Sequence, residues 1–258
     1  AGKEWDGRDR LGTEFSALEF IWRNGIRSVP QPVIADRKHG CAIYEFVDGR
    51  RVAGSQVTSD DIDQTARFLI ELRGLTSCSG SDLLPVAGDS GLSVKAVHDS
   101  IQIRLSRLME AEGGTPGYAA LGEFLQIQYL PYLKRAMEWV ETRLQSMNLS
   151  FEAELQEQDR TLSPSDFGYH NVLRRHDGKL VFIDFEYFGW DDPVKLTADF
   201  LLHPGHTLDQ GPAERFYLGA CRLFDDGGDF AIRLAALYRL YGLRWCLIVL
   251  AEFLPERM

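Results

Sequence analysis

The sequence is poor in several features that would assign a protein to a familiar class. Its 258 residues include only four cysteines, which lie far apart and form no Cys-x-x-Cys pair, so neither a zinc site nor a disulfide framework is indicated. Basic residues are in the minority, since 28 Lys and Arg stand against 38 Asp and Glu, a net charge of −10. This balance argues against a nucleic-acid partner and against binding to an anionic membrane. A reduced, cytoplasmic setting fits these absences best.

Long apolar runs are also scarce. The most apolar stretch, residues 245–250, is far shorter than the ~20 residues that cross a bilayer, and no signal-peptide pattern opens the chain. We therefore expect no membrane segment. A glycine-rich phosphate loop is missing too, because Gly178-Lys179 is followed by leucine rather than serine or threonine. The hydrophobic content of 45% and charged content of 26% are those of an ordinary globular protein with a sizeable core.

Helical and strand patterns follow each other along the whole chain. The periodicity predicts helices over residues 13–24, 58–74, 93–109, 119–147, 213–224 and 230–253, and strands over residues 33–35, 41–47 and 180–183. Thr13 and Ser59 are the expected N-caps of the first two helices, and Pro131 should bend or divide the fourth. The last helix is apolar almost all round, so we expect it to be buried.

Three polar residues between positions 162 and 192 carry the chemistry. Asp166 lies in a short polar loop, Asn171 follows five residues later, and Asp184 comes directly after an apolar strand. A carboxylate can orient an attacking hydroxyl and receive its proton, whereas carboxylate and amide oxygens suit Mg²⁺. Asp166 therefore fits a catalytic base, and Asn171 and Asp184 fit metal ligands. These intervals are those of a kinase catalytic loop and its metal-binding aspartate.

This stretch resembles the aminoglycoside phosphotransferase and choline kinase family, whose members are relatives of the protein kinases. The family pattern is His-Gly-Asp-x-x-x-x-Asn followed by Ile-Asp-Phe/Trp-Glu. Here the loop reads Ser163-Pro-Ser-Asp-Phe-Gly-Tyr-His-Asn171, and the strand end reads Phe182-Ile-Asp-Phe-Glu186. Ser-Pro-Ser replaces the usual start of the loop, but the acids and the amide are present. The resemblance extends over residues 12–253 by pattern, and over residues 162–199 by specific motif.

The resemblance implies an α+β, bilobal, protein-kinase-like fold with a truncated small β lobe. Residues 1–48 would be the remainder of the N-terminal small lobe, a helix plus a hairpin, with a hinge near residues 45–49. Residues 49–258 would form a mainly helical C-terminal lobe. That lobe would carry the catalytic loop at 162–171 and the metal-binding strand end at 181–187.

The resemblance also implies where the nucleotide binds. Glu14, or Glu19 as the alternative, would pair with a lysine that holds the nucleotide. The backbone of Glu45, Phe46 and Val47 would hold the adenine edge.

The lysine itself is not assigned. In the family it lies on an apolar strand upstream of the first helix, after a hairpin that covers the phosphates. Here only Lys3 lies upstream, without a strand pattern around it. The chain begins at Ala1 and has no methionine before Met109. We therefore expect a missing native start to carry these elements, and we expect this chain alone to be poorly active.

Other polar residues near the motif receive supporting roles. By resemblance, Asp199 would steady the catalytic loop from below, and we expect His170 to pack within that loop. Glu186 could touch a second cation or form a surface salt bridge, and both readings stay open. His203 and His206 flank Pro-Gly and are interpreted as ordinary loop histidines. Asp191 and Asp192, before Pro193, could form an Asx turn.

The functional hypothesis is an ATP- and Mg²⁺-dependent phosphotransferase that acts on a hydroxyl of a small molecule. The acceptor could be an aminoglycoside, a choline-like alcohol, a sugar or an amino-acid-derived alcohol, and the acidic composition would suit a cationic one. The alternative is a kinase-like protein that binds a nucleotide or metabolite without transferring phosphate. A metal phosphohydrolase would need more ligands than the sequence offers. Nothing in the sequence indicates an oligomeric state.

Overall fold

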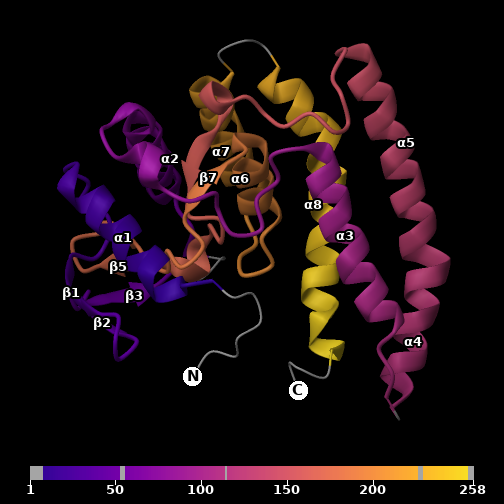
Figure 1. Ribbon diagram of the computed structural model, residues 1–258, viewed down its shortest axis with the longest axis horizontal. Coiled ribbons are helices and arrows are strands. Elements are labelled where there is room, and N and C mark those ends of the chain that lie inside the picture. Colours follow the sequence, from indigo (N-terminus) through magenta and orange to yellow (C-terminus); the bar gives the residue numbers. More distant parts are fainter. Residues whose placement is uncertain (1–7, 53–55, 114, 226–228, 255–258) are drawn as a thin grey trace.

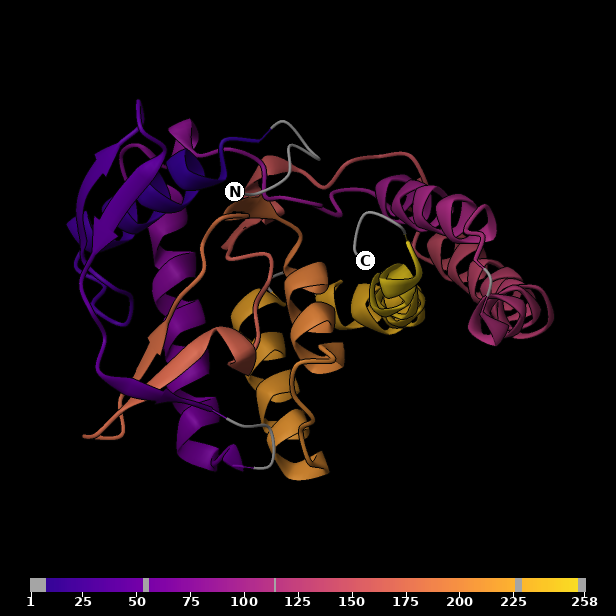
Figure 2. The ribbon, with the colours of Figure 1, turned by 90° about the horizontal axis from the view of Figure 1, so that it is seen from below.

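The protein has two parts of unequal size. The computed structural model describes residues 8–52, 56–113, 115–225 and 229–254. A small part built from one helix and a hairpin lies at one end, and the long helices of the large part lie at the other (Figures 1 and 2). Helices and small antiparallel sheets make up both parts. The predicted α+β, bilobal fold is confirmed.

The small part begins with helix α1 (Arg10–Arg23). The helix starts three residues before the predicted cap Thr13, because the carboxylate of Asp9 accepts the N–H of Gly12 at 2.8 Å and caps the helix instead. The face that α1 buries consists of Gly12, Ala17, Leu18, Phe20 and Ile21. Its four larger residues belong to the same hydrophobic cluster as Phe68 and Phe182, which lie in the large part, so α1 packs against the large part.

The hairpin of the small part consists of β1 (Pro32–Asp36) and β2 (Cys41–Tyr44), which pair antiparallel. The second strand was predicted to reach residue 47 but ends at Tyr44, because residues 45–48 leave the hairpin and cross to the next sheet. The domain boundary near residues 45–49 stays a prediction.

Two further sheets position the functional loop. β3 (Gly49–Arg51) pairs with β5 (Val172–Arg175), which pairs with β6 (Leu180–Phe182), all antiparallel. β4 (Thr161–Ser163) pairs with β7 (Gly189–Asp191). The loop that carries Asp166 therefore connects β4 of one sheet to β5 of the other. Only β6 was predicted among these strands, since runs of three or four residues give a weak period-two signal.

The remaining α-helices are α2 (Ser59–Gly74), α3 (Val94–Met109), α4 (Pro116–Phe124), α5 (Leu130–Ser146), α6 (Pro193–Leu202), α7 (Gln210–Phe224) and α8 (Phe230–Leu250). Helices α2 and α6 contact these sheets, whereas α3 and α5 pack against α8. Short 3-10 turns complete the described chain: η2 (Leu75–Ser77), η3 (Ser81–Leu83), η5 (Glu157–Asp159), η6 (Tyr169–Asn171) and η7 (Ala251–Phe253). Helix α6 was not predicted.

The helix caps show where local chemistry decides a boundary. Ser93, where the third helix was predicted to begin, caps α3 by accepting the N–H of Ala96. Thr58, rather than the predicted Ser59, caps α2, because its hydroxyl and the carboxylate of Asp61 form a reciprocal capping box. The expected break near Pro131 occurs just before it, where the π-helical turn η4 (Leu125–Tyr129) joins α4 to α5.

Helix α8 corrects the expectation that no stretch could span a membrane. The helical stretch Phe230–Phe253, which is α8 and the turn η7, is long and apolar enough to do so by length and composition, with a mean hydropathy of 1.5 over an 18-residue window. The prediction considered only the uninterrupted run at residues 245–250. In the fold, α8 packs against α3, α5 and α6, and both Tyr241 and Arg244 are buried there. The predicted burial of this helix is thus found on the side that packs against these helices, whereas Ile232 and Val249 are exposed.

Phe68 of α2 tests the packing that joins helix and sheet. Its ring is 1% exposed and stacks on Phe182 of β6, with ring centroids 4.2 Å apart and an interplanar angle of 9°. Phe68→Ala should lower the free energy of unfolding by about 3–5 kcal/mol, because it leaves a cavity in the core. Ile70→Ala on the same helix, where the side chain is 55% exposed, should cost under ~0.5 kcal/mol. Urea unfolding of both variants measures the difference, and equal losses would contradict this packing.

Candidate active site

The loop between β4 and β5 is fixed by its alternating side chains. Phe167 and Tyr169 are buried in the core, whereas Asp166 and His170 are only partly buried. Ile183, just after β6, donates its N–H to the carbonyl of Asn171 at 2.9 Å. The loop and the strand end that were predicted to act together are therefore adjacent.

Ser165 shows how the loop adopts its shape without the glycine that the family usually has. Its φ of 68° is in the left-handed region that favours glycine. Its hydroxyl donates to the carbonyl of Gly88 at 2.6 Å and accepts from Nζ of Lys195 at 3.3 Å. Its N–H donates to Oγ of Ser163 at 3.0 Å. These contacts compensate for the unfavourable backbone and fix the residue that directly precedes Asp166.

Two histidines hold the Asp166 carboxylate. Nε2 of His203 lies 3.0 Å and Nε2 of His170 lies 3.3 Å from Oδ1 of Asp166, and the two imidazoles stack with centroids 4.0 Å apart. Partial burial raises the pKa of Asp166, but the hydrogen bonds and charges of the two histidines outweigh it and hold this pKa well below its usual range. Asp166 is therefore ionised at neutral pH. The interpretation of His203 as an ordinary loop histidine is wrong, because the turn after α6 returns it to the catalytic loop.

Asp166, His170 and His203 also have a spacing at which a metal ion could bind, with their ligand atoms within 4.8 Å of one another. The hydrogen bonds of His203 oppose that use. Its Nδ1 accepts the N–H of Gly205 at 2.9 Å, and its Nε2 faces the Asp166 carboxylate. A cation could bind this nitrogen only after the nitrogen had released its proton. In the arrangement seen here the two histidines hold Asp166 in place.

Asp184 lies in a concentration of negative charge. Its backbone is left-handed, with a φ of 68°. The pKa of Asp184 is raised to about 6, first by burial and then by the negative charges of Glu186, Glu14 and Asp166. A bound cation would reduce the repulsion among these carboxylates. The oxygen atoms of Asp184 and Asn171 are the hard donors that Mg²⁺ prefers. The residues present therefore fit that ion.

The surroundings of Asp184 separate the two glutamate alternatives. Glu14 accepts the N–H of Phe185 at 3.4 Å and the hydroxyl of Tyr44 at 3.2 Å, whereas Glu19 is exposed. Glu14 thus lies beside the strand end. Two alternatives were open for Glu186, a second cation or a salt bridge. The structure shows a salt bridge, in which Oε1 of Glu186 lies 3.1 Å from Nη1 of Arg10.

The predicted adenine-binding segment lies between β2 and β3. Glu45 donates its N–H to the carbonyl of Gln31 at 2.8 Å, and its carboxylate pairs with Arg175 of β5 at 2.7 Å. Phe46 is 88% exposed and Val47 is buried. The segment thus connects the small part to the sheet behind the catalytic loop, and its role in holding adenine stays a prediction. Lys3 lies outside the described residues.

A buried charge cluster lies behind the loop. Nζ of Lys195 is 2.9 Å from Asp191 and 3.0 Å from Asp199, and all three side chains are at most 2% exposed. Asp199 also pairs with Arg244 at 3.2 Å and accepts from the indole of Trp245 at 2.8 Å. Sequence reasoning missed Lys195. Its spacing of four residues from Asp199 was the available signal, because residues four apart share a helix face and both lie in α6.

The pair Asp191 and Asp192 divides into two roles. Asp192 accepts the N–H of Val194 at 2.8 Å and caps α6, as an Asx turn would. Asp191 instead pairs with Lys195 in the buried cluster, which is a correction to the expectation of an Asx turn for both.

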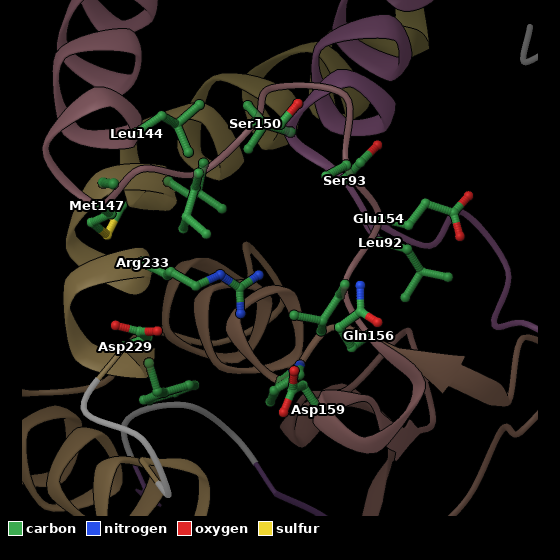
Figure 3. Close-up of a pocket in the computed structure, with 18 of the residues that line it drawn as sticks. Leu92, Ser93, Leu144, Met147, Ser150, Glu154, Gln156, Asp159, Asp229 and Arg233 are labelled. Atoms are coloured by element: carbon green, nitrogen blue, oxygen red, sulfur yellow. The ribbon is translucent and has the colours of Figure 1, made fainter.

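A cavity of about 770 Å³ opens beside Asp166, His170 and His203, between the catalytic loop and helices α3 and α8. Another cavity, of about 290 Å³, lies in the large part between the end of α5 and the start of α8 (Figure 3). None of the predicted site residues lines this second cavity, and its Arg233 pairs with the buried Asp192. The larger cavity is therefore the one that belongs to the site.

Comparison with known proteins adds a family and a fold. A sequence profile described as a phosphotransferase enzyme family matches residues 6–225. A spectinomycin phosphotransferase in complex with ADP and spectinomycin has a TM-score of 0.66 and 12% identity, covering 96% of this chain and 73% of that chain. A choline kinase from Streptococcus pneumoniae has a TM-score of 0.56 and 16% identity, with coverages of 100% and 80%. An ethanolamine kinase from Plasmodium vivax has a TM-score of 0.57 and 16% identity, with coverages of 96% and 66%. No curated protein matches the chain in sequence.

His206 gives the site a pH-dependent stability. It is 8% exposed, donates from Nε2 to the carbonyl of Phe200 at 2.8 Å, and accepts the N–H of Tyr169 on Nδ1 at 3.4 Å. Burial, followed by the charge of His203, lowers the pKa of His206 to about 4. The unfolded chain binds this proton near the ordinary pKa of about 6.5, so the stabilisation is complete above that pH and is lost as the pH falls toward about 4.

His206→Gln should reduce this pH dependence. Glutamine keeps one donor and one acceptor but does not titrate. Between about pH 7 and pH 4 the free energy of unfolding should fall further in the wild type than in the variant, by a difference on the order of 3 kcal/mol. Urea unfolding at several pH values measures the difference. Parallel pH profiles for the two proteins would contradict a neutral, buried His206.

Proposed function

Because the chain belongs to the phosphotransferase enzyme family, we propose that it transfers the γ-phosphate of ATP to a hydroxyl group of a small molecule. The observation that carries the proposal is the adjacency of three groups: an ionised Asp166, the amide of Asn171 and the carboxylate of Asp184. Phosphoryl transfer requires positioning and charge neutralisation more than covalent help from the protein, and these groups supply both.

Asp166 is the residue that meets the acceptor hydroxyl. Its Oδ1 is engaged by His170 and His203, and Nδ2 of Asn171 donates to its carbonyl at 3.1 Å. The carboxylate is thus fixed in orientation. Since its pKa is held low, it is a weak base, so it aligns the hydroxyl and takes the proton late, when the oxygen–phosphorus bond has largely formed.

Asn171 and Asp184 would hold Mg²⁺ at the strand end. The bound ion would neutralise charge on the phosphate oxygens. The backbone hydrogen bond between Ile183 and Asn171 holds the strand end next to the loop, which would limit changes in the distance between the two metal donors. Nucleotide use agrees with the ADP and AMP bound in the two spectinomycin phosphotransferase structures to which this fold is similar. Glu14, which accepts the N–H of Phe185, would orient a lysine that contacts the phosphates.

Asp166→Asn should abolish transfer while leaving the protein folded and able to bind nucleotide. Asparagine keeps an oxygen that accepts from the histidines but cannot align or deprotonate the acceptor, so turnover should fall about 10²–10⁴-fold. The matched control is Asp82→Asn, an exposed aspartate in η3. ATP consumption over a panel of hydroxylated acceptors, and a melting shift with Mg²⁺ and ATP, are the measurements. Undiminished turnover in Asp166→Asn would contradict the role of Asp166 as the base. If the wild type binds the nucleotide but does not consume ATP, the protein is a binding protein rather than a kinase.

Asp184→Asn should change the metal requirement. The variant loses one charged oxygen donor, so the Mg²⁺ concentration for half-maximal ATP consumption should rise at least about tenfold. A Mg²⁺ titration of wild type, Asp184→Asn and Asp82→Asn measures this. A variant that saturates at the same Mg²⁺ concentration as the wild type would show that Asp184 does not ligate the ion.

A further inference from the structure

The cavity of about 770 Å³ beside Asp166 is lined by charged side chains that already have partners. The carboxylate of Asp166 is held by its two histidines. Asp89 pairs with Arg104 at 2.6 Å and also with Arg244. Burial raises the pKa of Asp89, but the charges of Arg244 and Arg104 outweigh it and keep this pKa well below its usual range. Asp89 is therefore an ionised carboxylate that its own cations neutralise.

The other charged residues of the lining are engaged as well. Asp199 pairs with Arg244 at 3.2 Å and with the buried Lys195 at 3.0 Å. Arg8 and Arg107 also have partners. An ammonium or a carboxylate that entered the cavity would have to compete with these contacts, which is costly in a partly buried site. Among the residues that the structure describes, the lining thus holds no available charge of either sign for an acceptor.

Two large aromatic rings of the lining, those of Tyr187 and Trp245, could attract a cation without an acid. The ring of Tyr187 already has the guanidinium of Arg10 over it, 5.1 Å from its centroid. Trp245 donates its indole N–H to Asp199 at 2.8 Å and packs edge-on against His203, with ring centroids 4.5 Å apart. A quaternary ammonium group would therefore meet the ring of Trp245 alone rather than an aromatic cage.

The accessible part of the wall is apolar. Ile103 of α3 is 60% exposed, and Trp245, Ile248 and Ala251 are half-buried at the end of α8 and in the turn that follows it. The last three are spaced three residues apart, so they share one helix face. A ligand with an apolar body would remove this surface from water, which is favourable. Asp166 then supplies the polar group that orients such a ligand in a mainly apolar pocket.

We propose that the acceptor is an uncharged alcohol with an apolar body. Its hydroxyl lies toward Asp166, and its body lies against Trp245, Ile248 and Ile103. The proposal rests on the proposed function and specifies its acceptor. The acceptor oxygen forms a bond to the γ-phosphorus, the bond from this phosphorus to the ADP oxygen breaks, and the hydroxyl proton passes to Asp166. The acidic composition of the chain, which would suit a cationic acceptor, is not expressed as available acids at this cavity.

Three probes of one shape test the charge of the acceptor. Each is a cyclohexylethanol that carries a tert-butyl, a trimethylammonium or a carboxylate group on the far side of its ring. The tert-butyl and trimethylammonium groups have nearly the same size, so these two probes differ mainly in charge. Their dissociation constants for the intact protein are measured by calorimetry, and ATP consumption is followed with each. The tert-butyl probe should bind at least about tenfold more tightly than either charged probe.

Ile103→Lys tests whether the probes bind in this cavity. The substitution adds a cation at an exposed position of the wall, so the preference for the tert-butyl over the carboxylate probe should fall at least about threefold. The matched control is Ile70→Lys, at a 55% exposed position of α2 outside this lining, which should keep the wild-type ratio. Trp245→Ala, which removes the largest apolar side chain of the wall, should weaken binding of the tert-butyl probe at least about tenfold.

The outcomes separate this inference from the proposed function. Binding of a charged probe as tight as that of the tert-butyl probe, no binding of any probe, or an unchanged ratio in Ile103→Lys would overturn the inference. ATP consumption with a charged probe alone would overturn it and leave the phosphotransferase function standing. The expected binding order without ATP consumption would uphold the preference of the cavity for an uncharged ligand and count against phosphoryl transfer.

Discussion

The burial of Lys195 is the interaction on which the arrangement of the site depends. Moving a single charge into a protein interior costs several kcal/mol, so this ammonium is tolerated only because Asp191 and Asp199 surround it. Its remaining contact is the hydroxyl of Ser165. Through that contact the charge cluster holds a serine in a left-handed backbone conformation, directly before Asp166. The geometry of the loop thus depends on α6 as well as on the loop's own buried side chains, Phe167 and Tyr169.

The same cluster reaches the acceptor side of the site. Arg244 of α8 joins Asp199 to Asp89, and Asp89 joins Arg104 of α3. Helices α3, α6 and α8 are therefore connected by one chain of paired charges that runs behind the loop and ends at the cavity wall. Because each carboxylate in this chain has a cationic partner, the cavity can be lined by ionisable residues without being acidic. One set of ion pairs thus connects the loop of Asp166 to the wall of the cavity beside it.

Spacing along the sequence predicted which residues lie close together when they share one loop or are connected through a short strand. Asn171 follows Asp166 within one loop, and Asp184 ends the strand that pairs behind it, so their adjacency could be read from the chain. His203 could not be found this way, because it approaches Asp166 only after α6 and a turn have reversed the chain. The ion pair between Asp89 and Arg244 joins residues 155 positions apart and left no periodic signal. The helical framework was predictable from amphipathic spacing, whereas three-residue strands depend on pairing partners that are distant in the sequence.

The central claim is that this loop transfers phosphate rather than only holding a nucleotide. Phosphorus NMR of the protein with ATP, Mg²⁺ and anionic, neutral and cationic hydroxylated acceptors tests it most directly. The account predicts that the γ-phosphate resonance is replaced by those of ADP and a phosphate monoester of an acceptor. Intact ATP bound to the protein, with no new phosphorus signal in any mixture, would contradict it.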